Sequence, residues 1–227
     1  MNKEEDNIVI TIDGPVASGK STIAGKLAQR LGFLHIDSGA LYRKTGLLAD
    51  TRNISLKDED ACEAVAKSFS CEFRLNSKSL TDIYINGEIL GSEIRTENAG
   101  SLASVVSCLP KVRKVLTAIQ REQFLKSSLV LEGRDAGTIV FPDAKFKFYL
   151  DAAVEIRALR RLEEQKRRGK DITFEQIKAD LEERDHRDKN KGADSLKVTE
   201  TTQVINTDQM TIDDVVDKLE DIVRLSA

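Results

Sequence analysis

A glycine-rich segment near the start of the chain constrains the fold more than any other feature of the sequence. The segment from Gly14 to Ser21 reads Gly-Pro-Val-Ala-Ser-Gly-Lys-Ser and fits G-x-x-x-x-G-K-[ST] at every defined position. A β-branched run, Ile8–Ile12, precedes the loop, and apolar residues at every fourth position follow it, as in a helix. This order of strand, loop and helix predicts a nucleotide-binding α/β fold.

The residue types of the loop explain how it would bind phosphate. Glycines let the backbone curl so that its N–H groups point at phosphate oxygens, and the N-terminus of the next helix adds the positive end of its dipole. We expect Lys20 to reach the β- and γ-phosphates and the Ser21 hydroxyl to bind Mg²⁺. The plain alternative, a glycine-rich turn without a ligand, does not explain why strand, motif and helix are in register. The predicted triphosphate-binding residues are Gly14, Pro15, Val16, Ala17, Ser18, Gly19, Lys20, Ser21 and Thr22.

Strand and helix patterns alternate along most of the chain, which predicts a parallel sheet covered by helices on both faces. The region from Glu72 to Leu90 differs, because Asn86-Gly87 lies between two short strand-like runs and is typical of a type I′ hairpin. We therefore predict a core domain of residues 1–66 and 104–227 with an inserted subdomain at 67–103. A chain of 227 residues also suits two small domains.

Composition limits the partners of the chain. The 35 basic and 38 acidic residues leave a net charge of −3, which argues against a dedicated nucleic-acid binder. The acidic N-terminus has no signal-peptide pattern, and no apolar run approaches the ~20 residues that cross a bilayer. The three cysteines match no Cys-x-x-Cys spacing and suit a reducing compartment. We expect a cytoplasmic protein with no membrane or nucleic-acid partner.

Four clusters of polar residues accompany the phosphate loop, and one of them is formed by Ser104 and Arg113, which flank Pro110 at the end of the inserted segment. Asp37–Arg43 and Glu132–Asp135 each follow a predicted strand, at the sheet edge where ligands bind in open α/β folds. Arg184, Arg187 and Lys191 are spaced to share one face of a charged helix. Such a helix is usually just a solvated surface, but the acidic residues interleaved with these cations favour a hinged phosphate clamp.

Other residues have plainer interpretations. Asp185 fits an i, i+4 surface pair with Lys189. Neither His35 nor His186 has a nearby nucleophile or ligand set, so we do not expect either to be catalytic. The Asn190–Asp194 segment resembles the guanine-reading N-K-x-D motif, but its aspartate comes one residue too late and no strand precedes it. This disfavours a GTPase.

Together, the motifs resemble those of bacterial cytidylate kinases over essentially the whole chain. They are I-D-G-P-x-x-x-G-K-S-T, D-S-G-A-L-Y-R, E-I-R-T, P-x-V-R, G-R-D-A-G-T-I-V-F-P-D-A and E-R-D-x-R-D, in matching order and spacing. The resemblance implies the three-layer α/β fold of nucleoside monophosphate kinases, with a parallel five-stranded sheet, a small antiparallel β insert and a helical lid at about residues 157–191. It also implies a monomer that uses ATP and Mg²⁺ to phosphorylate CMP and dCMP.

The same resemblance assigns the acceptor site. The CMP-binding residues would be Ser38, Arg43 and Arg134 at the phosphate, Ser104, Arg113 and Asp135 at the cytosine, and Asp188 and Lys191 at the ribose. The catalytic cations would be Lys20, Arg134, Arg184 and Arg187. Lys191 departs from the family pattern, in which an arginine is expected, and a lysine lacks the planar bidentate fork.

The chemistry of cytosine agrees with these assignments. A carboxylate such as Asp135 can accept from the exocyclic amine, while Ser104 or Arg113 donates to the ring acceptors. Uracil reverses the polarity at two positions, so the site should reject it. Two alternatives stay open: another P-loop small-molecule kinase, such as a UMP/CMP kinase, and a nucleotide-gated binding protein without its own acceptor.

Overall fold

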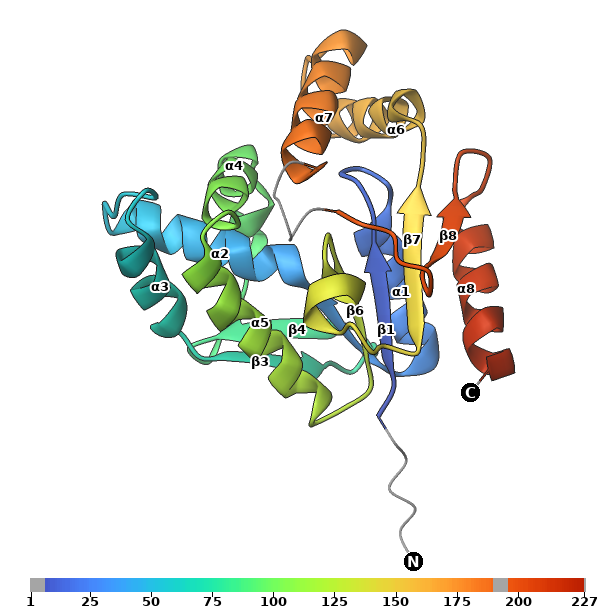
Figure 1. Cartoon of the computed structure of the whole chain (residues 1–227). Helices are drawn as coiled ribbons and strands as arrows, with labels where there is room; N and C mark the ends of the chain where they lie inside the picture. The colour runs from blue at the N-terminus through green and yellow to red at the C-terminus, as the bar shows by residue number, and fades with distance from the viewer. Residues whose placement is uncertain (1–6, 190–195, 227) are drawn as a thin grey trace, which may run out of the picture. The chain divides into compact units, whose positions relative to one another are not determined.

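The computed structural model describes residues 7–189 and 196–226, and its larger sheet has the parallel, five-stranded form that the sequence predicts (Figure 1). The strand order is β2-β6-β1-β7-β8. The strands are β1 Val9–Asp13, β2 Leu34–Asp37, β6 Leu129–Gly133, β7 Phe146–Asp151 and β8 Gln203–Asn206. Every residue of β1 and β6 is buried, as expected of strands that are covered on both faces. The predicted α/β class is confirmed.

One compact unit of the chain, Ile10–Leu31 with Glu132–Ala227, contains the phosphate loop. In it β1 pairs in parallel with β7, and β7 pairs in parallel with β8. Its helices are α1 Lys20–Leu31, α6 Val154–Arg167, α7 Phe174–Lys189 and α8 Ile212–Ser226, and a single π-helical turn, η2, spans Ala136–Val140. Two of these helices begin at a capping box, because Thr173 with Gln176 and Thr211 with Asp214 form reciprocal capping bonds.

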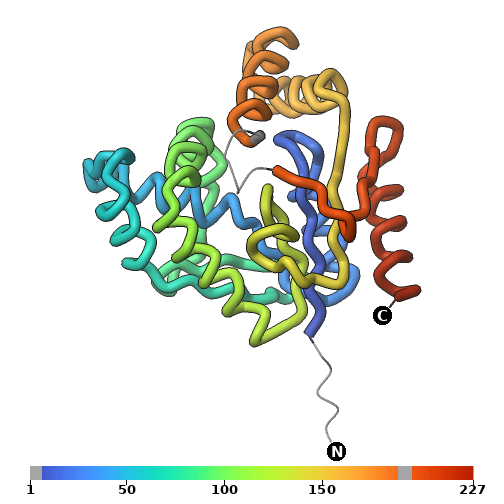
Figure 2. The backbone as a smooth tube through the Cα atoms, viewed as in Figure 1, coloured from blue at the N-terminus to red at the C-terminus, as the bar shows by residue number. Residues whose placement is uncertain are grey.

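Helices α6 and α7 follow β7 and pack against each other, as Figure 2 shows in orange. Ala158, Ile177 and Leu181 form their buried contact. Helix α6 ends before Gly169, whose φ of 72° lies in the left-handed region that a glycine adopts without strain. These two helices are the segment predicted as a lid.

The second unit comprises Met1–Val9 and Gly32–Leu131. Its helices are α2 Ser38–Thr51, α3 Glu59–Lys67, the 3₁₀ turn η1 Ser92–Arg95, α4 Glu97–Val106 and α5 Pro110–Phe124. Helices α2 and α4 approach closely at Gly46, where an added Cβ would lie 2.7 Å from the Cβ of Leu102. This close contact joins two helices that carry predicted acceptor residues.

The same unit contains the predicted antiparallel β insert. Strands β3 Cys71–Leu75, β4 Thr81–Ile85 and β5 Glu88–Ile89 form a three-stranded antiparallel sheet. Asn86 and Gly87 both have positive φ, 54° and 83°, as a type I′ turn requires, so the predicted hairpin is confirmed. The boundaries of a separate subdomain at residues 67–103 stay a prediction. In the described ranges, no helix has the length and apolar character that a membrane span needs.

Candidate functional site

The phosphate loop connects β1 to α1 with a backbone that its glycines make possible. Gly14 has a φ of 154°, and a Cβ there would lie 2.4 Å from the carbonyl oxygen of Leu150. Gly19 has a φ of 88°, and Ala17 also has a positive φ, 60°. The helix begins at Lys20, so its first N–H groups and its positive dipole end directly follow the loop.

Lys20 is buried beside the loop. Its Nζ donates to the carbonyl oxygen of Pro15 at 2.6 Å and to Oγ of Ser18 at 3.3 Å. Burial lowers the pKa of Lys20 to about 7, and repulsion from Arg134 acts in the same direction, against attraction from Glu132. A polyphosphate bound here would favour the charged ammonium again, since an opposite charge raises the pKa of a lysine.

Ser21 and Glu132 form a pair of oxygen ligands next to Lys20. The Ser21 hydroxyl donates to Oε1 of Glu132, which is buried near the end of β6. Hard oxygen ligands suit Mg²⁺, which usually binds one or two protein groups together with substrate phosphates. The donor set therefore fits a magnesium ion that is held mainly by a nucleotide.

Arg134 follows β6 and contacts α7. Its Nε donates to Oδ2 of Asp188 at 2.8 Å. Burial alone would favour the neutral form, but the attraction and the hydrogen bond from Asp188 raise the pKa of Arg134, so it stays a cation. The predicted phosphate-binding arginine and one predicted ribose-binding carboxylate thus lie together within one unit.

Asp135 is buried at the start of the π-helical turn η2. Its carbonyl oxygen accepts from the backbone N–H groups of Ile139 at 2.8 Å and Val140 at 3.1 Å. These bonds fix the backbone of a residue predicted to recognise cytosine. π-Helical turns are rare and frequently mark functional sites.

Arg157 joins α6, the phosphate loop and α7. Its Nη2 lies 2.5 Å from Oδ2 of Asp185, and its Nη1 donates to the carbonyl oxygen of Val16 at 3.0 Å. Only 5% of the Arg157 side chain and 16% of the Asp185 side chain are exposed. Asp185 therefore takes part in a buried ion pair, unlike the surface pair expected from the sequence.

Replacing Arg157 with methionine should lower the free energy of unfolding by about 3–5 kcal/mol, because it leaves the Asp185 carboxylate buried without its cation. Lys178→Met is the matched control, since Lys178 joins the same two helices through Glu155, but 32% of its side chain and 53% of that of Glu155 are exposed. That change should alter stability by less than about 1 kcal/mol. Urea unfolding measures both effects, and equal losses would show that burial of the Arg157 pair is irrelevant.

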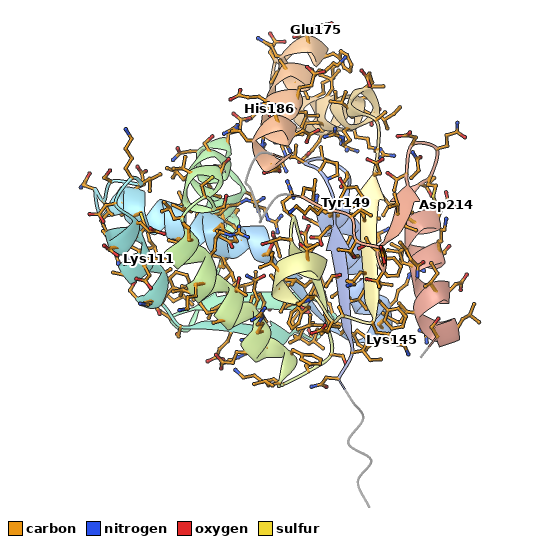
Figure 3. All side chains as sticks on the ribbon, in the orientation of Figure 1. Lys111, Lys145, Tyr149, Glu175, His186 and Asp214 are labelled. Carbon is orange, nitrogen blue, oxygen red and sulfur yellow. The ribbon has the colours of Figure 1, made fainter. Side chains whose placement is uncertain are left out.

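Two of the three cations predicted as a clamp, Arg184 and Arg187, lie on α7. Arg184 pairs with Asp180 at 3.6 Å and Arg187 with Glu183 at 3.8 Å, each one turn earlier in the helix. Burial lowers the pKa of Arg184, and repulsion from Arg134 adds to this shift. Lys191, the third predicted member, lies outside the described residues. His186 is exposed on α7 (Figure 3).

The second unit holds the other predicted acceptor residues. Asp37 caps α2 by accepting from the N–H of Ala40 at 3.2 Å, and it also pairs with Nη1 of Arg43 at 3.3 Å. Ser38 is buried in the first turn of the same helix. A helix N-terminus with an adjacent guanidinium is suited to an anionic phosphate.

Ser104 and Arg113 meet around one turn at the end of α4. Nη1 of Arg113 donates to the carbonyl oxygen of Ser107 at 3.2 Å, and the Ser107 hydroxyl donates to the carbonyl oxygen of Ser104 at 3.0 Å. The structure thus brings together, within this unit, two residues predicted to recognise the base. Pro110 begins α5 between them in the sequence.

Three residues at the site have no individual role in the sequence prediction: Asp13, Glu132, which is named there only as the first residue of a polar cluster, and Arg157. Asp13 and Glu132 are acidic residues at the ends of apolar strands, and this position is the sequence signal that could have identified them as site residues. Arg157 had no distinguishing signal, because it lies in a helix with many other charged residues.

Comparison with protein families matches residues 10–225 to the family described as cytidylate kinase. Curated relatives with that name include one from Pasteurella multocida, 39% identical over 93% of this chain and 92% of its own length. Another, from Vibrio parahaemolyticus, is 40% identical over 92% of each chain. A third, from Caldanaerobacter subterraneus, is 38% identical over 96% of this chain and 95% of its own length.

Proposed function

This chain belongs to the cytidylate kinase family, and we propose that it transfers the γ-phosphoryl group of ATP to CMP and dCMP, forming ADP and CDP or dCDP. The observation that carries the proposal is the charge cluster beside the phosphate loop. Lys20 and Arg134 are both cations there, and each is under the influence of the Glu132 carboxylate. A phosphate loop with a further cation beside it suits phosphoryl transfer, because that reaction needs cations around the moving group.

Phosphoryl transfer needs in-line positioning and cations around the moving group rather than covalent chemistry by the protein. Lys20 and the loop N–H groups would hold the β- and γ-phosphates. Ser21 and Glu132 would hold Mg²⁺, which supplies neutralisation of the phosphate charge when it is bound. The catalytic arginines would stabilise charge on the transferring group: Arg134, Arg184 and Arg187.

The acceptor roles are part of this proposal. Ser38, Arg43 and Arg134 would bind the CMP phosphate, and Asp188 with Lys191 the ribose. The contact between Arg134 and Asp188 supports a shared task for these two side chains. The capped start of α2 supports the phosphate role of its first residues.

An assay of ADP release with a panel of nucleoside monophosphates tests the proposal. CMP and dCMP should stimulate ADP release strongly, and UMP, AMP and GMP should do so weakly. Comparable rates with UMP and CMP would favour a UMP/CMP kinase. ADP release that no monophosphate stimulates would favour a nucleotide-gated binding protein.

Replacing Asp135 with alanine should reduce kcat/KM for CMP about 10–100-fold, equivalent to roughly 1.5–3 kcal/mol for a hydrogen bond to a charged group. UMP should lose much less, because its carbonyl oxygen faces the carboxylate as a second acceptor. The ratio of the two kcat/KM values is the informative quantity. Asp143→Ala, at an exposed position in the loop that follows η2, is the control and should leave the ratio unchanged. An equal fall for both substrates would mean that Asp135 only orients its neighbours.

We also propose that the protein acts as a cytoplasmic monomer on small nucleotides. The nearly balanced charge of −3 supports small-molecule substrates over nucleic acid. Light scattering of the purified protein with and without nucleotides gives its mass directly.

A further inference from the structure

Asp13 is an acidic residue in the interior of the phosphate-loop unit. It ends β1, and only 4% of it is exposed. A buried carboxylate is unfavourable unless hydrogen bonds or charges compensate it. Oδ1 of Asp13 accepts from the N–H of Ala136 at 2.9 Å, and Oδ2 accepts from the N–H of Gly137 at 2.8 Å. Both carboxylate oxygens therefore accept hydrogen bonds from one short backbone segment.

That segment is the first turn of η2, immediately after Arg134 and Asp135. The first N–H groups of a helical turn have no partner within the turn and are normally capped by the residue that precedes them. Asp135 occupies the N-cap position but makes no capping hydrogen bond. Asp13, which lies 123 residues before Ala136 and 124 residues before Gly137, caps the turn in its place. The Asp135 carboxylate is thereby not required for capping.

The segment is also tightly seated. A Cβ at Gly137 would lie 2.7 Å from Oγ1 of Thr11 and 3.1 Å from Cδ of Lys147. The backbone that follows Asp135 is thus confined by Thr11 of β1, by Lys147 of β7 and by the hydrogen bonds of η2. A small displacement of this backbone would move both Arg134 and Asp135.

We infer that Asp13 is a positioning residue for the acceptor: its carboxylate clamps the N–H groups of Ala136 and Gly137 and so holds Arg134 and Asp135 in the geometry that binds CMP. This inference rests on the proposed function. It gives the aspartate before the phosphate loop a role on the acceptor side of the reaction, distinct from the binding of ATP by the loop itself.

The clamp needs an ionised carboxylate, because two N–H donors require two acceptor oxygens. Burial raises the pKa of Asp13 to about 6, and the N–H groups of Gly137 and Ala136 oppose this shift. Repulsion from Asp135 raises the pKa of Asp13 further, and attraction from Lys20 lowers it. Asp13 also attracts Arg134 and raises the pKa of that guanidinium. Protonation below about pH 6 would turn one oxygen towards an N–H group as a donor.

The sign of the stability effect is opposite to that of the binding effect. A carboxyl whose pKa is raised on folding contributes stability below its unfolded pKa of 3.8, and that contribution is lost as the pH rises through about 6. The ionised form therefore destabilises the fold while it orders the acceptor residues. A residue with a merely structural role would improve stability and binding in the same direction.

Asp13→Asn tests the inference, since asparagine has nearly the same shape but offers one acceptor and one donor. KM for CMP should rise about tenfold or more, as expected for the loss of a hydrogen bond to a charged group, while KM for ATP changes less than about twofold. The preference for CMP over UMP should shrink. Asp151→Asn is the control, because Asp151 also ends a parallel strand, β7, but is exposed, and its kinetics should match the wild type.

The pH profile provides the second readout. The CMP phosphate titrates near pH 6 in every assay, so the quantity to follow is the ratio of wild-type to Asp13→Asn kcat/KM for CMP. This ratio should fall as the pH decreases from 8 to 5. If Asp13→Asn does not fold, Gly137→Ala displaces the same N–H group and should produce the same selective rise in KM for CMP.

Equal changes in KM for ATP and CMP, or a ratio that does not depend on pH, would overturn the inference. Failure of the proposed function is distinguishable, because the wild-type protein would then show no CMP-dependent ADP release at all.

Discussion

Replacing Lys20 with methionine should reduce kcat for CMP phosphorylation about 10²–10³-fold or more, since the loss of one preorganised group that stabilises transition-state charge has effects of this size. Lys20 Nζ lies against the carbonyl oxygen of Pro15, at the point where the phosphate loop meets α1. Methionine keeps a long, unbranched side chain but removes the charge together with the hydrogen bonds to Pro15 and Ser18. Because the ammonium is buried and its pKa is lowered, its removal should not unfold the protein.

The measurement combines steady-state kinetics with thermal unfolding. Lys26→Met is the matched control, because Lys26 lies on the same helix but is exposed and pairs with Asp213 at 2.7 Å. That variant should retain wild-type turnover. A Lys20→Met protein with near-normal kcat would show that Lys20 does not contact the transferring phosphates.

Replacing Arg184 with alanine should depress kcat by about 10³-fold or more, the contribution of an arginine that stabilises the transferring phosphoryl group. Arg184 is partly buried on α7, and its only described ion pair is a long one, 3.6 Å, with Asp180. A long pair of this kind is easily exchanged for a phosphate. Since the effect belongs to the transition state, KM for CMP should change much less than kcat.

Lys178→Ala removes a cation of similar exposure from the same helix, so it is the control for the helix itself and should leave kcat unchanged. An Arg184→Ala variant that lost affinity for CMP but kept its kcat would instead identify Arg184 as a binding residue.

The parts of the fold that the sequence predicts well are determined by local chemistry. Asn86-Gly87 gives a type I′ turn because both residues tolerate positive φ. The start of α3 is less clear from the sequence: Ser55 and Asp58 fit a capping box, which predicts a helix from Ser55, but Asp58 itself is the N-cap and the helix begins at Glu59. Two candidate caps within one turn cannot be separated by pattern alone.

In the site, too, the residues set by local sequence are predicted and those that depend on distant partners are not. The residues of the phosphate loop are contiguous, so their types and spacing are enough to predict the loop from the sequence. The roles of Asp13, Glu132 and Arg157 depend on partners that are far away in the chain, and burial of these polar side chains is visible only in the folded structure. The π-helical turn after Asp135 likewise depends on the carboxylate of Asp13, which no local pattern around residues 136–140 reveals.

Transfer of a labelled γ-phosphate from ATP to CMP tests the central claim most directly. The protein should produce labelled CDP in a 1:1 ratio with ADP in the presence of Mg²⁺, dCMP should give labelled dCDP, and Lys20→Met should give almost none. Release of the label only as inorganic phosphate, or its appearance in UDP at the same rate as in CDP, would contradict the account.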